Sequence, residues 1–311
     1  MSPGPAGDTS APQVVETLAE LDLRHPVVCI GNFDGVHLGH RALLARMAEV
    51  AASVGAPSAV VTFFPPAKVV FGTATYLSSA EEKLELLAGF RPTAVVLERF
   101  SREYAQTDKA VFVDLLRRLA PHTIIVGEDF RFGHQRQGTL NDLSPIAQRL
   151  EAFGLITSGG EVVKSSRVRE HLAAGRIARA NALLGAPYPV RGEVITGARR
   201  GRTIGFPTAN IATGERKALP GGVFAVTVDT PTGRFGGMAN VGPRPSFPDE
   251  PPSLEVHLFD YAGDLYGRVV TTRFHAFLRT QRRFSGLEGL KAQLADDERA
   301  ARTALADVIY S

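Results

Sequence analysis

The 311-residue chain has no tryptophan, one cysteine and three methionines. A single cysteine excludes an internal disulfide and any metal site built from several cysteines, so we expect a reduced, cytoplasmic protein. No apolar run approaches the roughly 18 residues that a membrane-spanning helix needs. Residues 1–18 have neither a basic start nor an apolar centre, which predicts a disordered leader rather than a signal peptide.

A strong charge of one sign is also missing. The formal net charge is +3, and the arginines are spread along the chain instead of forming a block. This balance does not favour nucleic-acid binding, whereas small anionic ligands fit it well. We therefore expect small-molecule substrates and neither nucleic acid nor membrane as a partner. Weak homo-oligomerisation stays open.

The first half of the chain alternates between strand and helix patterns. Residues 78–90 open with Ser79 followed by Glu82, the pattern of a capping box at the start of a helix. The alternation predicts a parallel sheet with helices on both faces, and ligands of such sheets bind at the carboxyl ends of the strands. The expected strands are 25–31, 58–64, 93–100 and 122–130, and the expected helices are 41–56, 78–90 and 108–120.

The second half begins with a helical-hairpin pattern over 165–185, which prolines and a glycine then interrupt. Short β-rich runs between Gly, Pro and Asp turns follow, as is typical of a small antiparallel barrel. Residues 286–309 predict an amphipathic C-terminal helix. We therefore expect a leader over 1–18, one domain over 19–186 and a second over 187–311.

The stretch GNFDGVHLGH, residues 31–40, stands where an expected strand gives way to a helix. A helix N-terminus attracts anions, and Gly35 and Gly39 let a phosphate approach the backbone. His37 and His40 add hydrogen-bond donors for charge that develops on a phosphoryl group. Two histidines at this spacing are a weak signal alone, and two surface histidines that cap a helix are the alternative.

A second stretch, GARRGRTIGFPTAN over residues 197–210, is rich in glycine and arginine but lacks the lysine and the spacing of a P-loop. Thr208 and Asn210 lie two residues apart, so on an extended segment they face the same side. Their oxygens would suit a Mg²⁺ ion that bridges ATP phosphates. An ordinary β-turn with polar residues is the alternative.

Several motifs together resemble one known family. GNFDGVHLGH and KSSRVRE resemble the two signatures of the nucleotidyltransferase superfamily, and VGEDFRFGHQRQG resembles the flavin-proximal segment of one of its branches. GFPTAN, GGVFAV, ANVGPRPSF, LEVHLFD and DLYG follow the order and spacing of the riboflavin kinase domain. Over about residues 20 to 305, the chain resembles the bifunctional bacterial riboflavin kinase/FAD synthetase family.

The resemblance implies a Rossmann-like α/β nucleotidyltransferase domain, then a small antiparallel β-barrel kinase domain with a C-terminal helix. It implies ATP-dependent phosphorylation of riboflavin to FMN, and adenylylation of FMN to FAD with release of pyrophosphate, with Mg²⁺ as the cofactor. Glu255 matches the general base of the kinase, and His37 and His40 match the histidines that receive the ATP triphosphate for adenylyl transfer.

The remaining site residues follow from the same match. Thr208 and Asn210 correspond to the metal site. The flavin-binding set is Asp129, Phe130, Phe132 and Arg279, although without the family match core packing is the favoured interpretation of the two phenylalanines. The ATP- and phosphate-binding set is Gly31, Asn32, Phe33, Asp34, Gly35, Gly39, Ser165, Ser166, Arg169, Gly197, Arg199, Gly201, Gly205 and Pro207.

The chain departs from the family pattern after the second expected strand. Phe64 stands where the family has an aspartate, and Pro66 where it has a histidine. One alternative is therefore a riboflavin kinase whose N-terminal half binds nucleotide without turnover. A flavin-binding or flavin-delivery protein without catalysis is an alternative from another class, and RNA binding by the first half is a further one.

Overall fold

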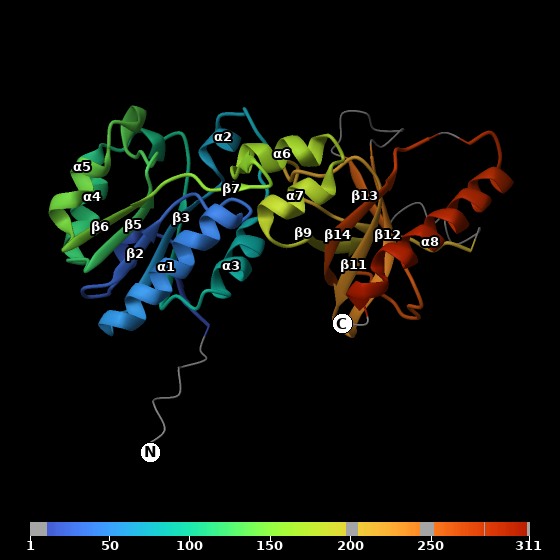
Figure 1. Ribbon diagram of the computed structural model, residues 1–311, viewed down its shortest axis with the longest axis horizontal. Helices are drawn as coiled ribbons and strands as arrows, with labels where there is room; N and C mark the ends of the chain where they lie inside the picture. Colours follow the sequence, from blue (N-terminus) through green and yellow to red (C-terminus); the bar gives the residue numbers. More distant parts are fainter. Residues whose placement is uncertain (1–10, 197–204, 243–251, 283, 310–311) are drawn as a thin grey trace, which may run out of the picture. The chain divides into compact units, whose positions relative to one another are not determined.

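The computed structural model describes residues 11–196, 205–242, 252–282 and 284–309 (Figure 1). The chain divides into two compact units, and each is described by itself. The first unit is Met1–Thr73 with Lys83–Ile156, and the second is Ala74–Glu82 with Thr157–Ser311. Across the described part of the chain, no helix has both the length and the apolar content needed to cross a membrane.

The first unit is built on a six-stranded, all-parallel sheet with the strand order β1-β4-β3-β2-β5-β6. Its central strands are apolar runs because both faces of the sheet are covered. The strands are β1 (Gln13–Val15), β2 (Val27–Ile30), β3 (Ser58–Phe64), β4 (Ala94–Arg99), β5 (Thr123–Gly127) and β6 (Arg149–Phe153).

Helices cover both faces of this sheet, as the alternating pattern predicts. On one face, Leu44 and Met47 of α1 (Leu38–Val54) pack with Cys29. On the other face, Phe112 of α4 (Lys109–Arg118) packs with Ile30. The other helical segments are α2 (Ala67–Val70), α3 (Ala80–Ala88), α5 (Leu140–Leu143), and the short 3-10 turns Leu18–Glu20, Tyr104–Gln106, His134–Arg136 and Ser144–Ile146.

The expected leader over residues 1–18 is too long and is corrected here. Strand β1 pairs in parallel with β4, and the side chains of Val15 and Leu18 belong to the core. The Arg118 guanidinium donates to the carbonyl oxygens of Leu18 and Ala19, at 3.2 and 2.6 Å. Two buried side chains and an edge-strand pairing therefore order a segment whose composition alone resembles a leader.

The second unit contains a closed antiparallel barrel with the strand order β10-β13-β12-β11-β14-β9. Its interior holds aromatic rings, with Phe224 edge-on to Phe274 at a centroid distance of 5.3 Å. The strands are β9 (Tyr188–Ile195), β10 (Ala209–Ile211), β11 (Gly222–Thr230), β12 (Gly233–Gly242), β13 (Ser253–Leu258) and β14 (Val269–Arg279).

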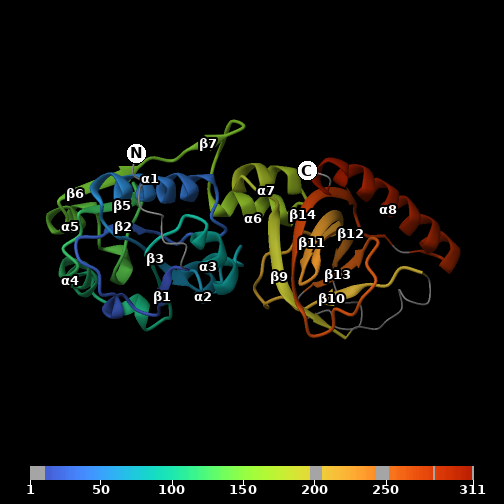
Figure 2. The ribbon, with the colours of Figure 1, turned by 90° about the horizontal axis from the view of Figure 1, so that it is seen from below.

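A long C-terminal helix, α8 (Leu287–Ile309), covers part of the outer surface of the barrel (Figure 2). Ala301 and Leu305 of this helix are fully buried against Ala225 of β11 and Met238 of β12. Side chains of these strands are consequently buried both inside and outside the barrel. This explains why β11 is apolar over most of its length.

The predicted helical hairpin consists of α6 (Ser165–Ala173) and α7 (Ile177–Leu184), and a short β-hairpin, β7 (Thr157–Ser158) with β8 (Glu161–Val162), precedes it. The Asn181 amide fixes α7 to the barrel, because it donates to the carbonyl oxygen of Phe274 and accepts from the Tyr188 amide, at 2.8 and 2.9 Å. By its packing the hairpin is grouped with the barrel. The functional boundary near residue 187 stays a prediction.

The predicted capping box of α3 is confirmed. The Ser79 amide donates to the Glu82 carboxylate at 2.7 Å, and the Glu82 amide donates to the Ser79 hydroxyl at 3.2 Å. Glu82 also accepts from the buried Lys217 ammonium at 2.5 Å and from the Arg191 amide at 2.7 Å. Removal of either Glu82 or Lys217 would leave the other charge buried and unpaired, which is costly. This ion pair therefore fixes residues 74–82 within the second unit.

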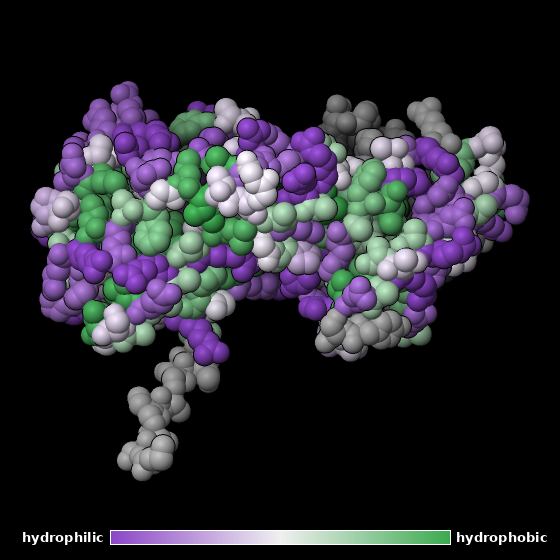
Figure 3. Space-filling view, viewed as in Figure 1, coloured by the Kyte–Doolittle hydropathy of each residue, from purple (hydrophilic) through white to green (hydrophobic). Residues whose placement is uncertain are grey.

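Large hydrophobic side chains that remain exposed are scattered over the described surface. Phe71, Val111 and Leu155 in the first unit, and Phe277 and Leu287 in the second, are examples. On the face shown in Figure 3, hydrophobic residues form separate patches among hydrophilic ones. Single exposed apolar side chains are usual on protein surfaces, so they indicate no particular partner.

Candidate active sites

The turn from β2 to α1 has an unusual backbone. Phe33 and Val36 have φ angles of 41° and 42°, in the left-handed region that residues other than glycine rarely adopt. Gly35, between them, has a φ of 79°. A Cβ atom on Gly31 would lie 3.0 Å from the Phe33 ring, which is tighter than an ordinary contact, so this position favours glycine. Such strained turns are concentrated at ligand-binding sites.

The two histidines of this turn lie against each other at the start of α1. Their rings are stacked with centroids 3.6 Å apart, and the His37 ring accepts a hydrogen bond from the His40 amide at 3.3 Å. A Cβ on Gly39 would lie 3.3 Å from the His37 ring, so a small residue leaves room for the stack. His37 caps the helix as a surface histidine would, but its side chain is buried.

Burial lowers the pKa of His40 well below its ordinary value, and the nearby His37 and Lys83 side chains act in the same direction. His40 is therefore neutral at neutral pH, and only one of its ring nitrogens carries a hydrogen. Its Nδ1 atom is buried and has no hydrogen-bond partner among the described residues. A neutral imidazole at a helix N-terminus can still donate its one N–H group to a phosphate oxygen.

Lys83 completes this site, although the sequence did not single it out. The side chain is fully buried, and its Nζ atom donates to the carbonyl oxygens of Asn32 and Phe63, at 2.8 and 2.6 Å. Nζ also lies 5.7 Å from the centroid of the Phe64 ring. A lysine within an amphipathic helix pattern ordinarily faces solvent, so only the fold reveals this position.

The carboxyl end of β5 lies beside that of β2, because the two strands are neighbours in the sheet. Asp129, Phe130 and Phe132 follow β5 at this edge. The rings of Phe130 and Phe132 are stacked, with centroids 5.7 Å apart. Phe132 is buried in the core and Phe130 packs on that core, so both rings contribute to core packing. Their flavin-binding role, like that of Asp129, stays a prediction.

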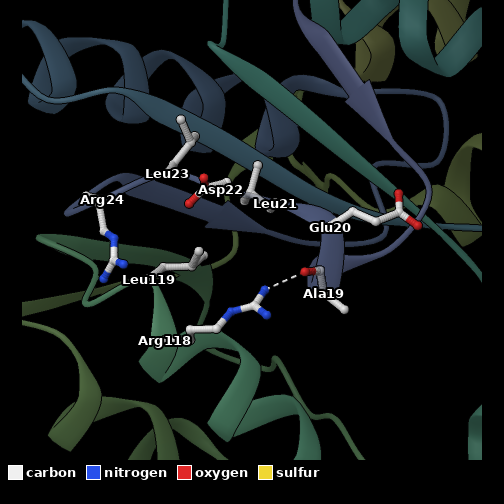
Figure 4. A pocket seen from close by; sticks show the side chains of 8 residues that line it. All are labelled: Ala19, Glu20, Leu21, Asp22, Leu23, Arg24, Arg118 and Leu119. Carbon is white, nitrogen blue, oxygen red and sulfur yellow. Dashed lines mark hydrogen bonds between the residues drawn. The ribbon is translucent and has the colours of Figure 1, made fainter.

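The opposite edge of the sheet contains a cavity of about 230 Å³ (Figure 4). Its lining residues precede β2 and β5 in the chain, so the cavity lies at the amino ends of the strands. Ligands of parallel sheets bind at the other edge. The lining residues are Ala19, Glu20, Leu21, Asp22, Leu23, Arg24, Arg118 and Leu119. This cavity is therefore separate from the candidate nucleotide site.

In the barrel, three expected site residues fall on one row across five strands. Asn210 pairs with Glu255, Glu255 with Asn240, Asn240 with Val223, and Val223 with Arg279. Side chains directly opposite each other in a ladder point to the same face. The fold thus brings Asn210, Glu255 and Arg279 to one face, although up to 69 positions separate them in the chain.

This face is the outer one, next to α8. Leu254 and Val256, which flank Glu255, are buried in the barrel, so the carboxylate of Glu255 points outward. Asn240 lies directly beside Glu255, and its side-chain oxygen accepts a hydrogen bond from Gln281 at 2.8 Å. Sequence reasoning missed Asn240. The ANVGPRPSF motif contains it, but the motif alone does not reveal its register with Glu255.

Arg279 is fixed at the edge of this face. Its guanidinium makes a bidentate contact with Asp297 of α8, with nitrogen–oxygen distances of 2.6 to 3.0 Å. Asp297 is almost fully buried. Such a pair is geometrically specific and anchors the helix to β14. Flavin binding by Arg279 stays a prediction.

The second nucleotidyltransferase signature opens α6, in the second structural unit. Ser165 and Ser166 form its first turn, and Lys164 is its N-cap residue. The Arg169 side chain donates to the carbonyl oxygen of Thr75 at 2.6 Å. Arg167 instead pairs with Glu170 at 2.6 Å on the surface. The phosphate-binding roles of Ser165, Ser166 and Arg169 stay predictions.

The glycine-rich stretch before β10 is described only in part. Gly197, Arg199 and Gly201 lie outside the described residues. Gly205 has a φ of 88°, which favours glycine, and the Pro207 carbonyl oxygen contacts the His257 ring nitrogen Nδ1 at 2.8 Å. Thr208 stands two residues before Asn210 and is half-buried. The phosphate and metal roles of these residues stay predictions.

Comparison with known families identifies both halves of the chain. A model described as FAD synthetase matches residues 20–167, and one described as riboflavin kinase matches residues 184–305. Together the two matches cover most of both structural units.

Three similar relatives carry the name bifunctional riboflavin kinase/FMN adenylyltransferase. The one from Pseudomonas fluorescens is 38% identical, over 93% of this chain and 97% of the relative. The one from Escherichia coli K12 is 36% identical, over 93% and 95%. The one from Listeria monocytogenes is 34% identical, over 89% and 91%.

Among solved structures, one titled macrolide-efflux protein from Streptococcus pneumoniae has a TM-score of 0.83 and 27% identity to this chain. The match covers 94% of this chain and 99% of that protein. The likeness extends over both units.

A nucleotide-binding α/β unit joined to a kinase barrel defines a two-domain transferase that carries out nucleotidyl and phosphoryl transfer. The chain belongs to the family of bifunctional riboflavin kinase/FMN adenylyltransferases, and its function is flavin cofactor biosynthesis. The family resemblance, the fold class and the enzyme class that the motifs predict are confirmed.

Proposed function

We propose that Glu255 is the general base for phosphorylation of riboflavin by the barrel. The 5′-hydroxyl oxygen of riboflavin forms a bond to the γ-phosphorus of ATP, its proton passes to the Glu255 carboxylate, and ADP leaves. The observation that carries this proposal is the row in which Glu255 stands between Asn210 and Asn240, facing outward. In this row the Glu255 carboxylate lies beside two neutral amide side chains, one of them the proposed metal ligand Asn210, so the base and the metal site are neighbours.

The metal ion of this reaction is Mg²⁺ in our proposal. Thr208 and Asn210 offer a hydroxyl and an amide oxygen, which are donors that suit a hard cation. Mg²⁺ normally takes few protein ligands and completes its shell with water and nucleotide phosphates, so two neutral oxygens fit its demand. When bound, the ion neutralises charge on the transferred phosphoryl group.

For the first unit we propose adenylyl transfer to FMN at the β2–α1 turn. A phosphate oxygen of FMN forms a bond to the α-phosphorus of ATP, the bond to the β-phosphate oxygen breaks, and pyrophosphate leaves. His37, His40 and the N-terminus of α1 stabilise the charge on the triphosphate, and no covalent enzyme intermediate is involved. The stacked histidines on a strained turn, at the ligand-binding edge of the sheet, support this assignment.

A second candidate is a kinase whose first unit only binds nucleotide. One observation favours it: Phe64 places an aromatic ring, rather than the carboxylate of the family pattern, 5.7 Å from the buried Lys83 ammonium. The flavin-carrier and RNA-binding alternatives have no comparable support, because a carrier needs no base beside a metal ligand. A cytoplasmic location and weak self-association remain predictions.

The test is a chromatographic time course of the purified chain with riboflavin, ATP and Mg²⁺. Our proposal expects FMN first and FAD afterwards. Accumulation of FMN without FAD, even when FMN and ATP are supplied directly, would support the kinase-only candidate. If neither product forms, both assignments fail.

A further inference from the structure

The fully buried Lys83 ammonium lies beside the candidate nucleotide site, and the proposed reaction does not use it. Lys83 has no exposed surface, and burying an ammonium is costly unless hydrogen bonds compensate for lost water. Besides the carbonyl oxygens of Asn32 and Phe63, its Nζ atom has a third acceptor in the Thr62 hydroxyl, at 3.5 Å. The three N–H groups of the ammonium therefore match three acceptors.

These acceptors lie where the sheet ladder between β2 and β3 ends. The last pairing joins Ile30 with Val61, and the Gly31 amide still donates to the Val61 carbonyl oxygen at 3.1 Å. Beyond this point, the Lys83 ammonium donates to the carbonyl oxygen of Phe63 in β3 and to that of Asn32, which follows β2. The Thr62 hydroxyl closes the network, because it also donates to the Asn32 carbonyl oxygen at 3.1 Å.

The network acts on the strained part of the turn. Asn32 directly precedes Phe33, whose left-handed backbone persists only if its surroundings enforce it. The Phe33 ring in turn lies edge-on to the His40 ring, with centroids 5.2 Å apart. A continuous series of contacts thus runs from the Lys83 ammonium through Asn32 and Phe33 to His40.

We propose that Lys83 is a positioning residue for adenylyl transfer: it holds the carboxyl ends of β2 and β3 together and so fixes the turn that presents His37 and His40 to the triphosphate. The inference rests on the proposed function of the first unit. Its structural part, the fixing of the turn by the ammonium, can be tested without turnover.

The charged and titratable groups that interact electrostatically with the ammonium are Asp34 and His40. Burial lowers the pKa of Lys83 to about 8, against the opposing effect of the Asp34 carboxylate. The ammonium is therefore present at neutral pH, and it loses one of its three donors as the pH rises through about 8. An unfolded lysine titrates near pH 10.4.

The consequence for stability has the opposite sign to that for activity. Between about pH 8 and about 10.4 the unfolded chain binds more protons at this lysine than the folded chain does, so the Lys83 contribution to stability rises with pH. Deprotonation of Lys83 therefore does not unfold the protein. If adenylyl transfer falls above about pH 8 because Lys83 loses its proton, the cause is a change in the folded site.

The first experiment is hydrogen exchange, followed by mass spectrometry, on the full chain and on Lys83→Met. The variant keeps a long, unbranched side chain but removes all three donors. We expect backbone amides of residues 31–40 to exchange about tenfold faster, as expected for a local opening that has become easier. Lys109→Met is the control, because this half-exposed lysine pairs with Asp142 and belongs to α4, on the other face of the sheet.

Thr62→Val is a second variant in case Lys83→Met fails to fold. Thr62 is fully buried, so it does not contact substrate, and valine has nearly the same shape. We expect the same segment to exchange faster, by a smaller factor. If residues 31–40 exchange at the wild-type rate in the folded variants, the proposal is overturned.

The second experiment measures kcat/KM for FAD formation from FMN and ATP between pH 6.5 and about 9.5, a range that spans the lowered lysine pKa. Wild type and Lys109→Met should lose activity above about pH 8. Lys83→Met should have a lower kcat/KM for FAD formation at every pH and should not show the decline above about pH 8. Its formation of FMN from riboflavin should be unchanged. If the decline above about pH 8 persists in Lys83→Met, the proposal is contradicted. If wild type makes no FAD, the proposed function fails, and hydrogen exchange still decides the role of Lys83.

Discussion

Glu255 and Asn210 lie directly opposite each other across the β10–β13 ladder, on the outer face of the barrel. The register therefore places the proposed base next to the proposed metal ligand without any contribution from loops. Strand pairing is rigid compared with loop structure, so it holds two reacting groups at a fixed separation.

Glu255→Gln should lower kcat for FMN formation by a factor of about 10² to 10⁴, the usual contribution of a general base. ATP binding should remain, because the amide keeps the shape of the carboxylate. Glu193→Gln is the matched control, since it removes an exposed carboxylate from β9 of the same barrel. Steady-state kinetics with riboflavin measure the effect, and normal FMN production by Glu255→Gln would refute the assignment.

His40→Ala should abolish FAD synthesis and spare FMN synthesis, because the stacked pair and the turn belong to the first unit alone. His122→Ala is the control. His122 directly precedes β5, at the amino edge of the sheet, and its ring contacts the Thr123 hydroxyl at 2.9 Å. Both products are measured in one chromatographic assay. Equal loss of FMN and FAD in His40→Ala would mean that the two activities are not divided between the units.

Asp297→Asn should destabilise the second unit by about 3 kcal/mol, because it leaves the Arg279 guanidinium without its buried partner. The neighbouring change Asp296→Asn breaks only an exposed pair with Arg299 and should cost no more than about 0.5 kcal/mol. Denaturant unfolding gives both values. Equal stability of the two variants would show that the contact between Arg279 and Asp297 does not anchor α8.

Cys29 should resist thiol reagents in the folded chain. It is fully buried in β2, and burial raises its pKa, so the reactive thiolate is suppressed. Because it is the only cysteine, the reagent should react at one site per chain once guanidinium unfolds the first unit. The rate of modification is followed by absorbance or mass. Rapid, stoichiometric reaction under native conditions would contradict the structure of β2.

Much of the fold follows from the sequence because its elements have a clear periodicity. The central strands β2 to β5, helices α1 and α4, and the capping box at Ser79 lie within a few residues of their expected bounds. Strand β1 was missed, because three residues that pair only at a sheet edge give almost no pattern. The antiparallel barrel was predicted, but the order of strands in the sheet and in the barrel comes from tertiary pairing that the sequence pattern does not contain.

The site is predictable to the extent that it lies in motifs. The residues of GNFDGVHLGH share one turn, and Asn210 and Glu255 lie opposite each other. Lys83 and Asn240 were not predictable, because their importance comes from tertiary contacts. A lysine on a helix and an asparagine on a strand are ordinarily solvated. Lys83 is buried beside the nucleotide site, and Asn240 pairs with Glu255 in the barrel. Both facts appear only in the folded structure.

The most direct test of the central claim, two independent active sites in one chain, is to mix two single variants. Glu255→Gln should make FAD from FMN but not from riboflavin, and His40→Ala should make only FMN. Together, with riboflavin, ATP and Mg²⁺, they should form FAD, because FMN released by one variant is the substrate of the other. If the mixture makes FMN but no FAD, while Glu255→Gln alone also fails with added FMN, adenylyl transfer by the first unit is contradicted.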